Sequence, residues 1–210
     1  RGPENPNARG RWAVWQDQSS GNPQIYVQDL LTPGFAPIRL PASSRSQEKP
    51  RTDGRYVVWQ SRQVNGGWDI WMADLLSGAQ PWAMTSTVDV DETNPSVDWP
   101  WVVYESKPTL DAKAPKQLKA VNLVTGITQS VSESAQDKLD PDVQAGRVVW
   151  QDNRDVGSGE IYFKNLESGE LRRLTTNAFG QYHPAIHGNW VVWQDNRNGQ
   201  VDLYAFDFLR

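Results

Sequence analysis

The sequence contains no cysteine among its 210 residues. Disulfide bonds, thiolate catalysis and cysteine-based zinc sites are therefore excluded together. The cellular compartment stays open, because proteins of oxidising compartments can also lack cysteine. The sequence also lacks any run of about 18 apolar residues, the length that a membrane span needs, so we expect no membrane insertion.

Basic residues are outnumbered. The 21 Lys and Arg against 25 Asp and Glu give a formal net charge of −4 and an isoelectric point of about 5.2. Such a chain has no positive field to gather phosphates, so we predict no nucleic-acid partner. The chain starts at Arg1 without an apolar leader, and we expect it to be a piece of a longer precursor.

Motifs for catalysis are missing as well. His183 and His187 are the only histidines, and Pro184 lies between them. In an extended strand, residues four apart are separated by about 13 Å, so we predict no metal site at this pair. No phosphate loop, metalloprotease motif or nucleophile elbow occurs. We therefore predict no catalytic residue, no cofactor and no enzymatic activity in this chain.

Tryptophan, in contrast, is abundant, with 11 copies. Many of them belong to a four-residue segment that returns five times, at intervals of 43 to 46 residues. A fixed period in this range indicates a repeat architecture. The five copies are Trp12-Ala13-Val14-Trp15, Tyr56-Val57-Val58-Trp59, Trp101-Val102-Val103-Tyr104, Arg147-Val148-Val149-Trp150 and Trp190-Val191-Val192-Trp193.

Each copy lies inside a longer unit with the pattern of four short strands. A proline segment precedes the tetrad and a polar loop follows it. Next come an alternating strand, a turn and a last strand such as 171–176. The strand residues are β-branched and aromatic types that fit a pleated, packed surface, and no window shows a helical period. The prolines that begin the units are Pro6, Pro50, Pro95, Pro141 and Pro184.

Repeated four-stranded sheets of about 40–45 residues are the blades of a β-propeller. We predict one all-β domain over residues 1–210, alone or as part of a larger propeller, with antiparallel blades whose strands follow chain order outward from the axis. The predicted repeats are about 6–49, 50–94, 95–140, 141–183 and 184–210. Four tryptophans are expected to wedge between neighbouring blades: Trp15, Trp59, Trp150 and Trp193.

With these motifs, the chain resembles the TolB-like propeller family, whose members carry WD40-like Tol repeats. The likeness rests on Pro184–Arg197, on Asp202-Leu203-Tyr204 and on Glu160-Ile161-Tyr162. It covers essentially the whole chain, and it implies a periplasmic, secreted or surface-anchored protein. The family's Ser-Pro-Asp-Gly turn is absent, as is the α/β domain of the Tol-Pal component, so a Tol-Pal role is not supported.

The fifth unit stops after its third strand, at 202–208, so this blade lacks its outer strand. Three outcomes are open: a five-bladed propeller with a blunt edge, a larger propeller continued on other sequence, or a strand added by another chain. An open edge with apolar side chains invites pairing. We expect a partner to cover the edge at Leu203, Tyr204, Phe206 and Phe208.

The Asp-Asn-Arg loops at 152–154 and 195–197 could suggest calcium. The stronger interpretation is structural, because Asp and Asn form turns. In that case each arginine pairs with a nearby carboxylate such as Glu160 or Asp202. A calcium site would need six or more oxygen ligands.

Two further regions are not explained by the repeat. The loop 107–116 is mildly basic, and its Lys107, Lys113 and Lys116 are candidates for a partner contact, although a tolerated insertion explains the loop as well. The off-pattern tryptophans either pack between blades or form a row of exposed rings that stacks on sugars. The candidates for stacking are Trp68, Trp82, Trp99 and Trp101.

The sequence thus favours a non-catalytic propeller that serves as a scaffold or recognition module of the cell envelope or extracellular space. Protein–protein interaction or self-assembly is the leading function. Carbohydrate binding by the exposed tryptophans is one alternative. The other is an accessory propeller domain of a peptidase whose catalytic domain lies outside these residues.

Overall fold

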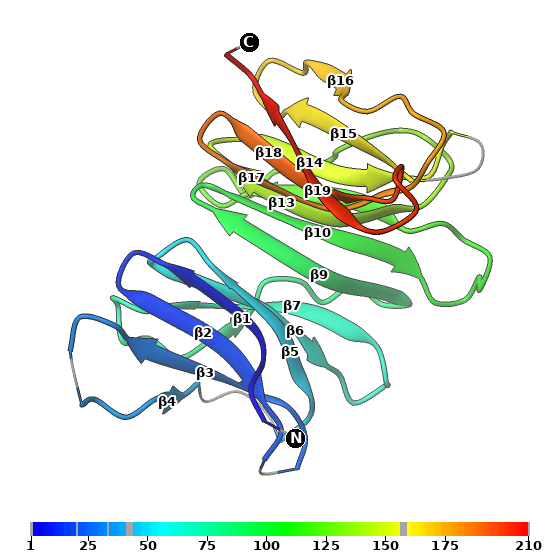
Figure 1. Cartoon of the computed structure of the whole chain (residues 1–210). Helices are drawn as coiled ribbons and strands as arrows, with labels where there is room; N and C mark the ends of the chain where they lie inside the picture. Colours follow the sequence, from blue (N-terminus) through cyan, green and yellow to red (C-terminus); the bar gives the residue numbers. More distant parts are fainter. Residues whose placement is uncertain (1, 20, 33, 41–43, 156–158, 210) are drawn as a thin grey trace. The chain divides into compact units, whose positions relative to one another are not determined.

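The computed structural model describes residues 2–209 except 20, 33, 41–43 and 156–158. In this part of the chain the regular structure is entirely β, with nineteen strands and no helix (Figure 1). The strands form four four-stranded sheets and one three-stranded sheet, each built from consecutive strands of one repeat. The predicted all-β, four-strand unit is confirmed, and so is the missing outer strand of the last repeat.

The sheets follow one another along the chain. The first contains β1 (Glu4–Arg9), β2 (Trp12–Asp17), β3 (Gln24–Asp29) and β4 (Ile38–Arg39). The second contains β5 (Gln47–Thr52), β6 (Tyr56–Arg62), β7 (Trp68–Asp74) and β8 (Trp82–Ala83). The third contains β9 (Val90–Asp98), β10 (Trp101–Pro108), β11 (Gln117–Asn122) and β12 (Thr128–Ser130). The fourth contains β13 (Lys138–Gln144), β14 (Arg147–Asp152), β15 (Glu160–Asn165) and β16 (Leu171–Arg173). The fifth contains β17 (Gln181–His187), β18 (Trp190–Asp195) and β19 (Asp202–Asp207).

The outermost strands are shorter than the sequence predicts. The strand expected at 171–176 ends at Arg173. Beyond it, the hydroxyl of Thr175 accepts the backbone N–H of Ile161 at 2.9 Å. A side chain therefore replaces the next backbone partner of the ladder, and regular pairing stops there.

By its contacts the chain divides into two compact units. The first comprises Arg1–Trp99 and Pro108–Ala112, and the second comprises Pro100–Lys107 and Lys113–Arg210. The division falls within the third repeat, so that β9 belongs to the first unit, while β11, β12 and all of β10 except Pro108 belong to the second. A single domain over the whole chain stays a prediction.

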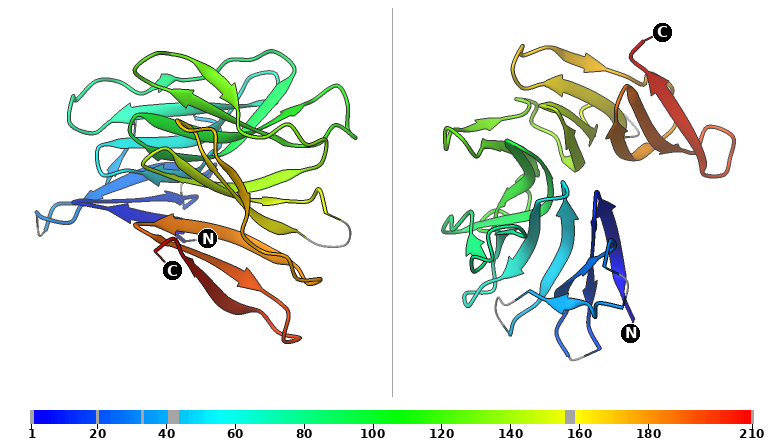
Figure 2. Two further views of the ribbon diagram at one scale, coloured as in Figure 1. Left: turned by 90° about the horizontal axis from the view of Figure 1, so that it is seen from above. Right: turned by 90° about the vertical axis from the view of Figure 1, so that its left-hand side faces the viewer.

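Within each unit, the first strand of one repeat packs across the sheet of the repeat before it. In the first unit β5 lies against β1, β2 and β3, and β9 lies against β6 and β7. In the second unit β13 lies against β11, and β17 lies against β13, β14 and β15. Figures 1 and 2 show β1–β4 beside β5–β8, and β13–β16 beside β17–β19. Neighbouring repeats thus meet face to face.

Tryptophans fill these interfaces, as the sequence predicts. Trp59 is fully buried against Val14 and Ile25 of the preceding repeat. Burying a side chain of this size removes about 150–250 Å² from water. Trp150 and Trp193 occupy the same place between later repeats. Trp15 differs: it is only half-buried, because the first repeat has no described repeat before it.

The first strand of each repeat has an unusual backbone just before its proline, and in four sheets a bulge is seen there. The residue before the proline has a left-handed backbone in all five repeats, with φ between 50° and 53° at Asn5, Lys49, Asn94, Asp140 and His183. The strand register shifts at this point in the first, second, fourth and fifth sheets. Asn, Asp and His tolerate this backbone better than other non-glycine residues, so Lys49 is the exception.

The bulge also ties neighbouring repeats together. After the first three tetrads, the next residue accepts the N–H of the following repeat's bulge residue. Gln16 Oε1 accepts from Lys49 at 2.8 Å, and Gln60 Oε1 accepts from Asn94 at 3.0 Å. In the second unit, Glu105 Oε1 accepts from Asp140 at 3.0 Å. These side chains satisfy an N–H that the bulge removes from its own ladder.

Replacing the exceptional lysine should stabilise the first unit. We expect Lys49→Asn and Lys49→Gly each to raise the free energy of unfolding by about 0.5–1 kcal/mol, because both residues adopt a positive φ at lower cost. Urea denaturation followed by tryptophan fluorescence measures the change. Asn5→Lys is the reverse control and should lower the free energy of unfolding. A Lys49→Gly variant that is less stable than the parent would contradict this account of the bulge.

Candidate interaction surfaces

The Asp-Asn-Arg loops build a four-residue cluster at the end of the tetrad strand. The indole N–H of Trp150 donates to Asp152 Oδ2 at 2.9 Å, and Arg154 Nη2 pairs with the same oxygen at 2.6 Å. The guanidinium of Arg154 lies 4.2 Å from the ring centroid of Tyr162, which in turn stacks on Trp150. The fifth repeat reproduces the cluster with Trp193, Asp195, Arg197 and Tyr204.

This cluster corrects the predicted partner of the arginines. Arg154 pairs with Asp152, two residues before it, because stacking on the tyrosine turns the arginine back over its own strand. Glu160 instead pairs with Arg173 at 2.6 Å, and Asp202 accepts from neighbouring amides. The described residues contain no group of three or more His, Cys, Asp or Glu side chains placed to hold a metal ion. The loop carboxylates therefore have structural partners.

Asp195 shows what the pairing does to a buried carboxyl. Burial acts to raise its pKa, but the hydrogen bonds from Arg197 and from the Trp193 indole outweigh burial and lower the pKa to about 2. Its ordinary value is 3.8. The ionised carboxylate therefore stabilises the folded state above pH 3.8, and this contribution is lost as the pH falls toward 2.

Breaking this pair should be costly. We expect Arg197→Met to lower the free energy of unfolding by about 2 kcal/mol at neutral pH, because it leaves the buried Asp195 carboxylate without its cation. The loss should shrink in acid, as the carboxyl becomes protonated in both states. Chemical denaturation at several pH values measures both effects. Glu170→Gln, at the exposed Arg172–Glu170 pair, is the control and should cost less than about 0.5 kcal/mol.

The two histidines have separate partners on the fourth repeat. His183 Nδ1 lies 2.7 Å from Asp140 Oδ2, and both residues occupy the bulge position of their repeats. His187 Nδ1 lies 3.3 Å from the amide nitrogen of Gln144. Their contacts are therefore those of neighbouring repeats.

The four tryptophans predicted to stack on sugars differ in exposure. Trp101 is buried in the core of the second unit, beside Val143 and Val148, so its assignment as a stacking platform is wrong. Its tetrad position places it in the interface between repeats. The other three are Trp68, which is half-buried under the guanidinium of Arg62; Trp99, which is 48% exposed but stacks on Tyr56; and Trp82, which is 41% exposed on β8.

The positive charge of the loop 107–116 is partly neutralised within the chain. Lys116 Nζ pairs with the buried carboxylate of Glu105 at 2.7 Å. Lys107 is half-buried, and Lys113 is exposed. Leu110 is the most exposed apolar residue of the loop. A partner contact at these three lysines stays a prediction.

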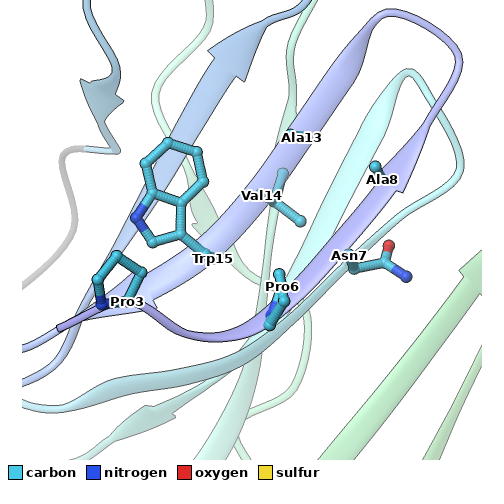
Figure 3. A pocket seen from close by; sticks show the side chains of 7 residues that line it. All are labelled: Pro3, Pro6, Asn7, Ala8, Ala13, Val14 and Trp15. Carbon is cyan, nitrogen blue, oxygen red and sulfur yellow. The ribbon is translucent and has the colours of Figure 1, made fainter.

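The first repeat leaves one face of its sheet uncovered. We call the face of a sheet that packs on the preceding repeat its leading face. In the second, fourth and fifth repeats the residues of the leading face are all buried. In the first repeat, Pro6 and Ala8 are exposed, and Ala13 and Trp15 are half-buried. Figure 3 shows them around a pocket of about 430 Å³ that also involves Pro3. The buried equivalents are Pro50, Thr52, Val57 and Trp59, then Pro141, Val143, Val148 and Trp150, then Pro184, Ile186, Val191 and Trp193.

The fifth repeat leaves the opposite face uncovered. Leu203 is 79% exposed, Val192 is 41% exposed, and Ala205 is exposed as well. All residues at the corresponding positions of the earlier repeats are buried: Val14, Ile25, Val27; Val58, Ile70, Met72; Val103, Leu118, Ala120; and Val149, Ile161, Phe163. We call Val192, Leu203 and Ala205 the trailing face of the last repeat. Val192 and Ala205 were missed in the sequence, although aligning the repeats would have identified them.

The edge strand β19 is less open than its sequence predicts. Tyr204, Phe206 and Phe208 are partly buried and pack against the cluster that includes Phe163. Phe163 and Phe208 lie 4.8 Å apart at their centroids. Leu203 points to the other face and is the predicted edge residue with the largest exposed fraction. The strand is still the last of its sheet in the order β17-β18-β19.

Two leucines at equivalent positions test whether this face is uncovered. Leu118 is fully buried, whereas Leu203 is largely exposed. We expect Leu118→Ala to lower the free energy of unfolding by about 2–5 kcal/mol and Leu203→Ala by less than about 0.5 kcal/mol at low protein concentration. Denaturant titration of both variants measures the difference. Equal losses would mean that something covers the trailing face even at low concentration.

Solved structures share this fold. A TolB structure from Agrobacterium tumefaciens matches with a TM-score of 0.73 at 15% identity, over 98% of this chain and 76% of that chain. A puromycin-hydrolyzing peptidase from Mycobacterium tuberculosis matches with a TM-score of 0.71 at 13% identity, over 98% of this chain and 35% of that chain. An oligogalacturonate lyase in complex with manganese matches with a TM-score of 0.69 at 15% identity, over 94% of this chain and 59% of that chain.

At these identities the likeness shows the fold alone. The chain is a TolB-like β-propeller in architecture, as its repeats predict. No family model matches the sequence, and no curated protein matches it. Among the described residues there is also no helix with the length and apolarity of a membrane span.

Proposed function

We propose that this chain is a non-catalytic propeller module that works by binding protein, and that its principal contact is the trailing face of the last repeat. The observation that carries the proposal is the exposure of Leu203 and Val192 at positions that are buried in every earlier repeat. Water-exposed apolar groups arranged as an interface mark a site of protein association.

The occupant that fits this face best is the leading face of a first repeat from a second copy. Within the chain, the trailing faces of the first, third and fourth repeats each receive a valine and a tryptophan from the next repeat. At the equivalent positions the first repeat presents Ala13 and Trp15, which are only half-buried, beside the exposed Pro6 and Ala8. A contact of this kind is head-to-tail, and it joins two different surfaces.

A polar contact supports the same arrangement. Gln194 occupies the place of Gln16 and Gln60, whose side chains accept the N–H of the following repeat's bulge residue. In the described part of the chain no partner of the Gln194 side chain is seen. The first repeat of a second copy would bring the N–H of Asn5 to this acceptor.

The setting we propose is the cell envelope or the extracellular space, which the likeness to TolB propellers supports. A second candidate is an accessory propeller of a larger peptidase. It is favoured by the match of nearly the whole chain to about a third of the puromycin-hydrolyzing peptidase, 35% of that chain. Carbohydrate binding has weaker support, because only Trp82 and Trp99 of the four predicted stacking tryptophans are exposed.

Association should depend on the trailing face. We expect the chain to associate with rising concentration in sedimentation velocity, and Leu203→Asp to weaken association by about 10- to 100-fold, the equivalent of burying one leucine. Leu76→Asp is the matched control at an exposed turn of the second repeat and should leave association unchanged. Leu110→Asp tests the loop 107–116 in the same way. A parent chain that stays monomeric at every concentration would overturn the proposed self-association.

A further inference from the structure

The first residue of the third strand has a hydrogen-bond donor in four of the five repeats. The position lies near one end of each sheet, and its side-chain oxygen accepts the hydrogen bond. The pairs are Gln24 with Arg39 at 2.8 Å, Gln117 with Lys138 at 2.6 Å, Glu160 with Arg173 at 2.6 Å, and Asp202 with Asn198 and Gln200 at 3.0 and 3.1 Å. In three of these repeats the donor is cationic.

The second repeat has the acceptor without the donor. Asp69 is the second residue of β7, and its partner Ser61 stands two residues after the tetrad strand's tryptophan, as Asp17 does opposite Gln24. Asp69 is 9% exposed, and no hydrogen bond to its side chain is seen in the described residues. In the first and fourth repeats the donor is the fourth-strand arginine opposite Tyr26 or Tyr162. In the second repeat, Ala83 stands at that register position, opposite Trp71. The arginine has thus been replaced by a methyl group.

The following repeat adds a second carboxylate instead of a cation. Glu92, on β9, occupies the position at which the fourth repeat has Lys138. Glu92 is 3% exposed. Its Oε1 accepts from the hydroxyl of Thr87 at 2.8 Å, but its Oε2 is buried without a hydrogen-bond partner among the described residues. An unsatisfied carboxylate oxygen in this position is costly unless a donor reaches it.

The electrostatics agree with this geometry. Burial, together with the charges of Glu92 and Asp91, raises the pKa of Asp69 to about 6. Burial also raises the pKa of Glu92. No positive side chain contributes to the pKa of Asp69. The pair is therefore a desolvated, negative centre for which the described residues provide no counter-ion.

A pocket opens at Asp69. It has a volume of about 300 Å³, and its lining includes Asp69, Thr87, Gly67, Val64 and Val88 but not Glu92. The hydroxyl of Thr87 links the wall of the pocket to Glu92. The volume is at the lower end of the range for small-ligand sites and suits the head of a single side chain.

We propose that this pocket binds the guanidinium group of an arginine side chain presented by a partner polypeptide. The guanidinium would take the place that Arg39 and Arg173 fill in their own repeats. A planar fork of donors suits the one carboxylate that lines the pocket, Asp69, whereas a metal ion needs several converging ligands. The described residues supply no such converging set of three. The valines that also line the pocket suit the aliphatic stem of the arginine.

A set of short peptides tests the occupant. The probes are the capped tripeptide Gly-Arg-Gly, its citrulline analogue, its lysine analogue and methylguanidinium, titrated by NMR of the tryptophan indole signals. We expect the arginine peptide to bind at least about tenfold more tightly than the citrulline peptide, because citrulline keeps the shape and loses the charge. Equal binding of the two peptides would overturn the proposal. Equal binding of methylguanidinium and the arginine peptide would overturn the polypeptide as the source.

Restoring the missing arginine provides the decisive variant. Ala83→Arg should pair with Asp69, raise the melting temperature and weaken binding of the arginine peptide by about tenfold or more, since the internal guanidinium competes. Ala83→Met is the matched control of similar length, and it should leave binding unchanged. Asp69→Asn should weaken binding without loss of fold, because it removes a destabilising charge. Unchanged binding in Ala83→Arg would overturn the site.

This site is independent of the proposed self-association. Asp69 and Glu92 belong to the first unit, and Leu203 belongs to the last repeat. Leu203→Asp should therefore leave arginine-peptide binding unchanged. Failure of one proposal leaves the other standing, because sedimentation and peptide titration report on different residues.

Discussion

The packing of one repeat's leading face on the trailing face of the repeat before it is the interaction on which the structure depends. Each sheet alone would expose apolar side chains on both sides. Stacking the sheets buries Trp59 against Val14 and Ile25 in the first unit, and Trp193 against Ile161 in the second. No helix contributes to this core in the described chain, so the sheets stabilise one another through shared side-chain contacts.

The polar contacts are adapted to the same geometry. In the second, third and fourth repeats, the N–H of the residue before the proline is satisfied by the residue after the preceding tetrad. The Asp-Arg pairs of the fourth and fifth repeats fix their tryptophans through the indole N–H. The second repeat differs. Asp69 has the acceptor carboxylate, but Ala83 has no donor group to pair with it, and the pKa of Asp69 is raised.

Much of the fold could be predicted from the sequence, because the tetrad and the proline recur at fixed spacing and directly report strand type and order. The length of the outer strands could not, since Thr175 ends its ladder through a tertiary hydrogen bond. Exposure was harder to predict still. Trp101 is predicted to be exposed and is buried. Leu203 occupies a strand position that is buried in the earlier repeats, and it is exposed. Only the position of a repeat within the array distinguishes these cases.

The array is directional, and this has a consequence for how such proteins change in size. Every repeat has a leading face and a trailing face, and the two faces are chemically different. Inserting or deleting one complete unit of the period would therefore recreate a matching junction at the splice, while the two outermost surfaces would keep their character. The number of repeats can thus change by duplication or deletion of whole repeats while every contact between neighbours is kept. Gain or loss of half a repeat would instead bring together two faces that do not match.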